Sequence, residues 1–174
     1  MNGIKVKMLK SWLLLLVFIS FNAEATHSNQ EIVLLRDLAL NSHFFGASLV
    51  DEETEMYNLY RSIKPSRASV WNPPETLSDP SISVKSYDVK IDSDNNFFVA
   101  WIGKNTVLEI YSLYVRQYSA IKGTWSDISM VSGVTENLTG DYSISIINRE
   151  TEIIWTSFDE RFNIESHSAT FQIG

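Results

Sequence analysis

Residues 91–101 read Ile-Asp-Ser-Asp-Asn-Asn-Phe-Phe-Val-Ala-Trp, and this stretch decides the fold class. Its first half, Asp92–Asn96, is rich in Asp and Asn, which favour turns because their side chains bond to nearby backbone groups. Its second half is a dense apolar run of the kind that strands prefer. Before the turn, Tyr87–Ile91 alternates polar and apolar residues. The stretch therefore predicts a β-hairpin with strands at 87–91 and 97–102.

The hairpin belongs to a pattern that returns every 54 residues. The matches are Trp71 with Trp125, Trp101 with Trp155, residues 55–60 with 109–114 (four of six identical), and, with a one-residue gap, Tyr87-x-Val89-x-Ile91 with Tyr142-x-Ile144-x-Ile146. Self-similarity at a fixed period is the signature of a repeat protein. The pattern predicts three copies, about 31–71, 72–125 and 126–174, in one domain over residues 26–174.

Each copy is predicted to be a four-stranded antiparallel sheet. In the second copy the third strand is expected at Val107–Val115, after a turn at Gly103–Asn105, and a short fourth strand lies around Trp125. The first copy departs from the pattern at residues 29–40. A capping box at Ser28–Glu31 would begin a helix there, but we favour a degenerate strand pair, followed by a strand over 41–50.

Four strands in a repeat of this length are typical of a β-propeller blade. The stretch 91–101, followed by Ile110, resembles blades of exported NHL- and YWTD-type propellers, and Ile153–Thr156 followed by Ile164 is similar. The resemblance implies an all-β partial propeller of about three blades. Propellers usually have 4–8 blades. Three arrangements are therefore open: a homodimer that closes a six-bladed ring, a fragment of a longer propeller, or a sandwich-like stack.

The N-terminus predicts export. Residues 1–25 combine three lysines, an apolar run over Trp12–Phe21 and an Ala23-Glu24-Ala25 cleavage site, which is the pattern of a signal peptide. A membrane anchor is disfavoured because the apolar run is about ten residues and a spanning helix needs roughly 20. We expect a secreted or periplasmic protein cleaved near Ala25, with no membrane insertion after cleavage.

Charge and composition limit the partners. The 174 residues carry 14 Lys and Arg against 21 Asp and Glu, a formal charge of −7, and they include no cysteine. Removal of residues 1–25, with three lysines and one glutamate, makes this −9. Such a surface repels nucleic acid on average. The absence of cysteine excludes disulfides and thiol catalysis.

No catalytic or metal site and no cofactor is predicted, and the ligand-binding residues stay unassigned. The four tryptophans that mark the repeat are expected to pack between sheets, although sugar platforms are the alternative. Asp92, Asp94 and Asn96 have calcium-loop spacing, but Phe97 and Gly103 occupy the positions where such a loop needs Gly and Glu, so a plain turn is expected. Three further sets of residues show no shared site pattern: His27, His43 and His167; Arg36, Arg61, Arg67, Arg116, Arg149 and Arg161; and the acidic run 51–53, read as a solvated loop.

These observations predict an exported binding module for a glycan or a protein surface. The alternatives are a sialidase-like glycoside-processing enzyme, which would need converging carboxylates and arginines, or a non-functional fragment of a larger propeller.

Overall fold

The structure is a computed structural model that describes residues 32–133, 136–147 and 150–172. These residues form three antiparallel sheets and contain no helix. Sheet A contains β1 (Val33–Arg36), β2 (Ser42–Asp51), β3 (Met56–Lys64) and β4 (Glu75–Thr76). Sheet B contains β5 (Ile82–Ile91), β6 (Phe97–Asn105), β7 (Tyr111–Ser119), β8 (Thr124–Trp125) and β9 (Ser129–Met130), of which the last two both pair with β7. Sheet C contains β10 (Asn137–Ile147), β11 (Glu150–Phe158) and β12 (Ile164–Gln172).

The fold is therefore all-β, as predicted, but the sheets have four, five and three strands rather than four each. None of the three sheets closes on itself. The predicted signal peptide lies outside the described residues. The described ranges contain no helix long and apolar enough to cross a membrane.

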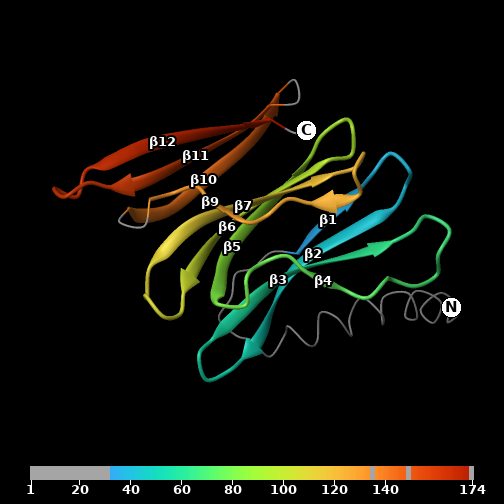
Figure 1. Cartoon of the computed structure of the whole chain (residues 1–174), viewed down its shortest axis with the longest axis horizontal. Coiled ribbons are helices and arrows are strands. Elements are labelled where there is room, and N and C mark those ends of the chain that lie inside the picture. Colours follow the sequence, from blue (N-terminus) through green and yellow to red (C-terminus); the bar gives the residue numbers. More distant parts are fainter. Residues whose placement is uncertain (1–31, 134–135, 148–149, 173–174) are drawn as a thin grey trace, which may run out of the picture.

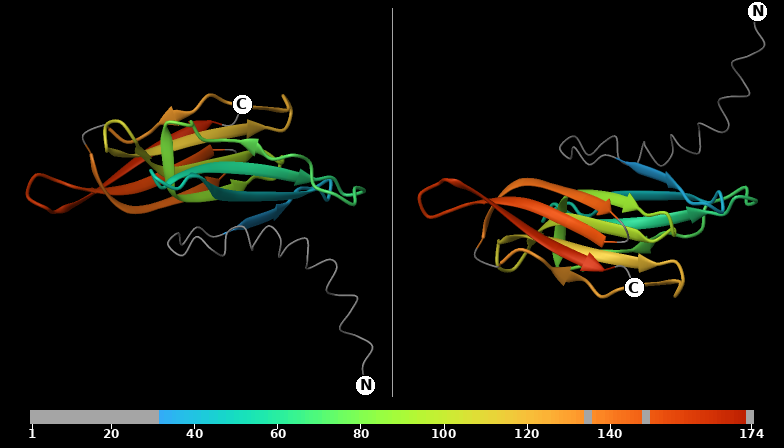
Figure 2. Two further views of the ribbon diagram at one scale, coloured as in Figure 1. Left: turned by 90° about the horizontal axis from the view of Figure 1, so that it is seen from below. Right: turned by 90° about the horizontal axis from the view of Figure 1, so that it is seen from above.

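Sheet B lies between the other two sheets, with sheet C on one side and sheet A on the other (Figure 1). Two hydrophobic cores hold this stack together, and further views show the layers side by side (Figure 2). The core between sheets A and B contains Phe45, Leu59, Leu77, Ile82, Val84, Val89, Phe97, Val99, Trp101 and Tyr114. The core between sheets B and C contains Phe98, Ala100, Ile102, Leu113, Val115, Ile144, Ile153 and Trp155.

The predicted hairpin is confirmed. Residues 87–91 lie in β5 and residues 97–102 lie in β6, with Ile91 opposite Phe97. Every residue from Phe97 to Gly103 is buried, on both faces of the strand. The reason is that sheet B has a sheet on each side, so a central strand has no solvent face and its sequence need not alternate.

The predicted third strand of this copy is wrong at its start, because β7 begins at Tyr111 and not at Val107. The side-chain oxygen of Asn105 accepts the amides of Val107 and Leu108 at 3.0 and 2.9 Å, which holds these residues in the turn. The turn predicted at 103–105 lies within β6 instead. Gly103 is required there by close packing, since a Cβ would lie 2.3 Å from the Ile82 side chain.

The first copy contains no helix among its described residues. Residues 32–40 contribute one strand, β1, rather than the favoured pair, and β1 pairs with β2, the strand expected over 41–50. The turn between β1 and β2, Asp37–Asn41, differs in sequence from the Asp92–Asn96 turn but has the same hydrogen bonds. In both turns the Asp side chain accepts the backbone amide and the side-chain amide of the Asn four residues later, all at 2.8 Å. Only these two polar side chains are needed, so Leu38–Leu40 can vary.

The two interfaces between sheets use corresponding contacts. The Tyr87 hydroxyl donates to the carbonyl of Phe45 at 3.1 Å, and the Tyr142 hydroxyl donates to the carbonyl of Ala100 at 3.2 Å. Burial of the Tyr142 hydroxyl raises its pKa well above the ordinary value of a tyrosine, so this hydroxyl remains a donor. A second recurrent contact is a ring stack, described below with the tryptophans.

Candidate binding surface

The tryptophans at the centre of the repeat pattern are core residues. Trp101 is fully buried and stacks on Tyr114 with ring centroids 5.8 Å apart. Trp155 is 6% exposed and stacks on His167 at 5.5 Å. The prediction that these two residues pack between sheets is confirmed, and their faces are not available to a sugar.

The other landmark aromatics lie nearer the surface. Trp71 and Trp125 are partly buried; Trp71 meets Phe44 edge-on, and Trp125 packs against Tyr118. Tyr111 is exposed whereas Tyr114 is buried, as expected for residues an odd number apart on one strand.

A buried charged cluster, which the sequence did not single out, lies between sheets A and B. Arg61 on β3 is 2% exposed, and its guanidinium lies over the rings of Phe97, Tyr118 and Trp125 at 4.9, 4.5 and 5.3 Å. Its Nη1 donates to Glu75 Oε1 at 3.0 Å. Favourable cation–π contacts and the ion pair offset the cost of burying the charge.

His43 on β2 completes this Arg61 cluster. Its Nδ1 accepts hydrogen bonds from Nε and Nη2 of Arg61, at 3.3 and 3.0 Å. Because arginine only donates, Nδ1 is the acceptor. The proton therefore lies on Nε2, which donates a hydrogen bond to Asp37 Oδ2 at 2.9 Å. Burial, together with the neighbouring Arg61 charge, lowers the pKa of His43 below its ordinary value, although Asp37 opposes the shift. Both ring nitrogens are occupied, so His43 has no free atom for acid–base catalysis.

The calcium-like motif is a turn, as expected. Oδ1 of Asp92 accepts the amides of Asp94 and Asn96, and Oδ2 accepts the Asn96 side chain, each at 2.8 Å. Asn95 between them takes a left-handed conformation with φ +65°. The turn thus uses its carboxylate oxygens internally. A search of the described residues found no group of three His, Cys, Asp or Glu side chains placed to hold a metal ion.

The same turn recurs between β11 and β12, where the sequence did not reveal it. Asp159 accepts the backbone amide of Asn163 at 2.8 Å and its side-chain amide at 2.9 Å. The residue before the Asn is left-handed in all three such turns, but here it is Phe162 (φ +62°) and between β1 and β2 it is Leu40 (φ +63°). A residue with a Cβ pays roughly 1–2 kcal/mol for this conformation, which Asn and Gly tolerate better. Phe162 is nevertheless 79% exposed.

The three turns that join second to third strands, β2–β3, β6–β7 and β11–β12, lie at the same end of the stack (Figure 1). We call them the hairpin tips; they span residues 52–55, 106–110 and 159–163. Large apolar side chains are exposed on or beside them: Val50, Val107, Leu108, Phe162 and Ile164. They are interspersed with acidic residues: Asp51, Glu52, Glu53, Glu55, Glu109, Asp159 and Glu160.

The outer face of sheet C differs in polarity from the corresponding face of sheet B. Positions that are Phe98, Ala100, Ile102, Leu113 and Val115 in sheet B correspond, by strand and pairing, to Glu152, Ile154, Thr156, Ser166 and Ser168 in sheet C. The face is therefore apolar in sheet B and largely hydroxylated in sheet C. Polar side chains of this kind can stay in contact with water.

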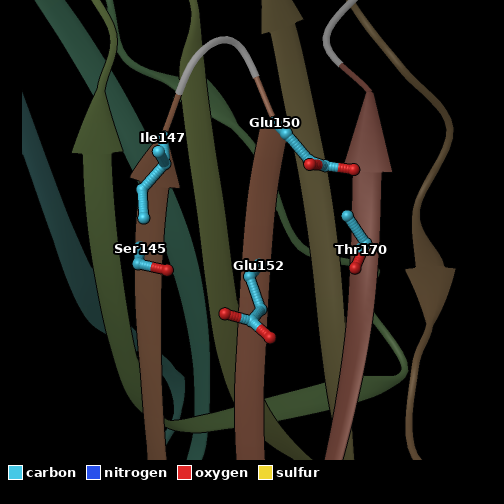
Figure 3. A pocket seen from close by; sticks show the side chains of 5 residues that line it. All are labelled: Ser145, Ile147, Glu150, Glu152 and Thr170. Carbon is cyan, nitrogen blue, oxygen red and sulfur yellow. The ribbon is translucent and has the colours of Figure 1, made fainter.

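A shallow, open hollow of about 270 Å³ lies on this outer face. Figure 3 shows Glu152 on the central strand between Ser145 and Thr170, with Ile147 and Glu150 beyond them. The lining is acidic and hydroxylated and includes no cation. The hollow can accept hydrogen bonds from a ligand, but it lacks the arginine that a sialidase-like site would require.

Of the remaining candidate residues, Arg116 adjoins the Arg61 cluster, because its guanidinium lies 5.7 Å from the centroid of the Trp125 ring, over which Arg61 also lies. His167 is bonded to the hydroxyl of Ser157 at 2.7 Å, and Arg116 donates to the carbonyls of Leu77 and Ser126 at 3.1 and 2.8 Å. His27 and Arg149 lie outside the described residues. Arg36 adjoins the β1–β2 turn, Arg67 lies in the β3–β4 loop and Arg161 lies on the β11–β12 hairpin tip.

Comparison with known proteins found no matching family model, no matching curated protein and no matching solved structure.

Proposed function

We propose that this chain is an exported, propeller-type repeat protein that binds a protein partner through its hairpin tips. The observation that carries the proposal is Phe162, a highly exposed aromatic side chain held in a left-handed backbone conformation. Leu40 and Asn95 take the same conformation in the matching turns, so the feature that distinguishes Phe162 is its exposed aromatic ring. Exposed aromatic residues are enriched in protein interfaces.

The choice of a protein over a glycan follows from where the aromatics lie. Sugar recognition uses open aromatic faces with polar groups beside them, but the indoles of Trp101 and Trp155 are buried. The hairpin tips offer apolar side chains among carboxylates instead. Such a surface fits a partner with apolar pockets rimmed by basic residues.

The repeat part of the proposal is supported by the recurrent contacts at offsets close to 54, namely the Tyr87 and Tyr142 bonds to the preceding sheet and the stacks of Trp101 and Trp155. Export is supported by the signal pattern in residues 1–25. N-terminal sequencing of protein secreted by a bacterial host should begin at Thr26. Retention of residues 1–25 in the exported protein would contradict this part of the proposal.

The binding experiment compares Phe162→Asn with Ile121→Asn. Both residues are exposed apolar side chains in turns, at 79% and 90%, but Ile121 lies in the β7–β8 turn at the other end of the stack. The immobilised proteins are incubated with an envelope extract of the source organism, and captured proteins are identified by mass spectrometry. We expect one or a few specific proteins on the wild type and on Ile121→Asn, and their loss on Phe162→Asn.

Circular dichroism must show that both variants are folded. Capture that survives Phe162→Asn would contradict the role of the hairpin tips. Saturable binding to members of a glycan panel, with no protein captured, would instead favour a lectin-like module, and cleavage of a panel member would favour an enzyme.

A further inference from the structure

The third strand of sheet C, β12, has a free edge, unlike β3 of sheet A and β7 of sheet B. In sheet A, β4 covers β3, and in sheet B, β8 and β9 cover β7. β12 pairs with β11 over all nine residues, Ile164–Gln172, and no described residue pairs with its other side. An uncovered strand presents a row of unpaired amides and carbonyls to any other strand.

The pairing pattern shows which groups face this edge. The Asp159 amide donates to the Asn163 carbonyl at 2.9 Å, so that pair is hydrogen-bonded. In an antiparallel ladder hydrogen-bonded and non-bonded pairs alternate. Residues 165, 167, 169 and 171 therefore bond to β11, whereas residues 164, 166, 168, 170 and 172 direct their amides and carbonyls to the free edge.

This edge carries few of the usual guards, and Glu165 is its one Asp, Glu, Lys or Arg residue. Residues 164–172 contain no proline and no lysine, and β12 pairs with β11 without a register shift. The opposite edge of sheet C is different: β10 has a register shift between Leu138 and Tyr142, and Gly140 within it has φ +100°. Bulges of this kind twist an edge away from strand addition. Only the β12 edge of sheet C is therefore open to a partner.

The way β3 and β7 are covered indicates what cannot cover β12. The Leu77 amide donates to the Leu59 carbonyl at 2.7 Å, and Val131 donates to Leu113 at 2.8 Å. Each covering segment is short, and its apolar residue packs into the core beside the neighbouring sheet. The outer face of sheet C has no described sheet above it. A short apolar segment would gain little there, so a partner must pair with the main chain over most of the strand.

We propose that this partner is β12 of a second copy, paired antiparallel about a two-fold axis at Ser168. In this register Ile164 faces Gln172 of the other copy, and the five edge-facing residues form about ten main-chain hydrogen bonds, two for each facing pair. On the outer face Ser166 lies opposite Thr170, and the two Ser168 residues meet, a pairing of hydroxyls that strands favour.

Charge also permits this arrangement. Glu165 is the only Asp, Glu, Lys or Arg residue in β12, and it would lie opposite Phe171, so no like charges face each other. The contact is isologous, so it closes after two copies and does not propagate. It joins two copies of sheet C edge to edge, which differs from the face-to-face stacking that would close a propeller ring. Of the apolar residues on or beside the hairpin tips, Ile164 alone also belongs to β12.

Cysteine cross-linking tests the register directly. The chain contains no cysteine, so Ser168→Cys introduces a unique thiol. At the proposed axis the two Cα atoms form a hydrogen-bonded pair about 5.5 Å apart, within the range for a disulfide. We expect mild oxidation to convert Ser168→Cys to a covalent dimer. Ser143→Cys, on the same face but on β10, should stay monomeric on a denaturing gel.

Proline substitution tests the edge independently. Residue 168 does not use its amide to bond β11, so Ser168→Pro should leave the β11–β12 ladder intact. Light scattering should give a dimer mass for the wild-type protein at tens of micromolar and a monomer mass for Ser168→Pro. A wild-type monomer, a Ser168→Pro dimer, or equal cross-linking of Ser143→Cys and Ser168→Cys would each overturn the proposal.

Discussion

Substituting phenylalanine for each of the two buried tryptophans should separate packing from hydrogen bonding in this fold. Trp101 and Trp155 have similar surroundings, with exposures of 0% and 6% and stacked partners at 5.8 and 5.5 Å. Their indole nitrogens differ. Nε1 of Trp155 donates to Glu136 Oε2 at 2.7 Å, whereas Nε1 of Trp101 is buried with no acceptor among the described residues.

The magnitudes follow from this difference. Both Trp→Phe changes remove the same volume, so their packing losses are similar. Trp155→Phe also loses a hydrogen bond to a charged acceptor, about 1.5–3 kcal/mol. Trp101→Phe instead removes a buried donor whose desolvation is uncompensated, about 1–3 kcal/mol in favour of the variant. Trp155→Phe should therefore lower the free energy of unfolding by at least about 2 kcal/mol more than Trp101→Phe does.

The assay is urea unfolding followed by far-ultraviolet circular dichroism, because the substitutions change tryptophan fluorescence. Glu136→Ala alone and combined with Trp155→Phe completes a double-mutant cycle that isolates the bond, because alanine has no side-chain acceptor for the indole N–H. Equal destabilisation by the two Trp→Phe changes, or a larger loss at Trp101, would refute the reasoning and show that the Trp101 nitrogen is satisfied.

Three further outcomes are expected. The pKa of His43 is lowered in the folded protein, so the unfolded chain takes up the proton more readily. The free energy of unfolding should therefore fall as pH drops below about 6.5. Urea titrations at pH 7.5 and 5.5 measure this change, and His43→Gln should make the free energy of unfolding less dependent on pH. Arg61→Lys should cost about 3–5 kcal/mol, since an ammonium cannot reproduce the planar fork that joins His43 and Glu75 over the aromatic rings; a loss below about 1 kcal/mol in the same assay would contradict the cluster's contribution. Phe162→Gly should be more stable than Phe162→Ala by about 1 kcal/mol, because only glycine escapes the left-handed strain; thermal unfolding compares the two, and equal midpoints would show the turn unstrained.

Local sequence chemistry was sufficient for the β5–β6 hairpin and the turn between its strands. Asp92 and Asn96 mark a hairpin because their side chains satisfy the turn's own backbone. The dense apolar run at 97–101 marks a strand with two covered faces. The prediction failed where packing between separate strands decides the residue type. Gly103 looked like a turn residue, but it lies in β6, where the Ile82 side chain leaves no room for a Cβ.

The burial of two tryptophans was also predicted from the sequence. Trp101 and Trp155 stand 54 residues apart, and the expectation that they pack in the core is confirmed by their exposures of 0% and 6%. The β11–β12 turn escaped notice because Phe162 occupies a position where Asn or Gly is usual.

The tertiary structure alone decided which surfaces are functional candidates. Arg61 is an ordinary strand residue in the sequence, and only the packing of sheet A on sheet B places it over Phe97, Tyr118 and Trp125. The serines of β12 look like any solvated strand positions until the pairing shows that no described strand covers them. Strand propensity and turn chemistry act between residues a few positions apart, so the sequence displays them. Burial of a charge and exposure of an edge depend on neighbours from distant segments, which only the folded chain brings together.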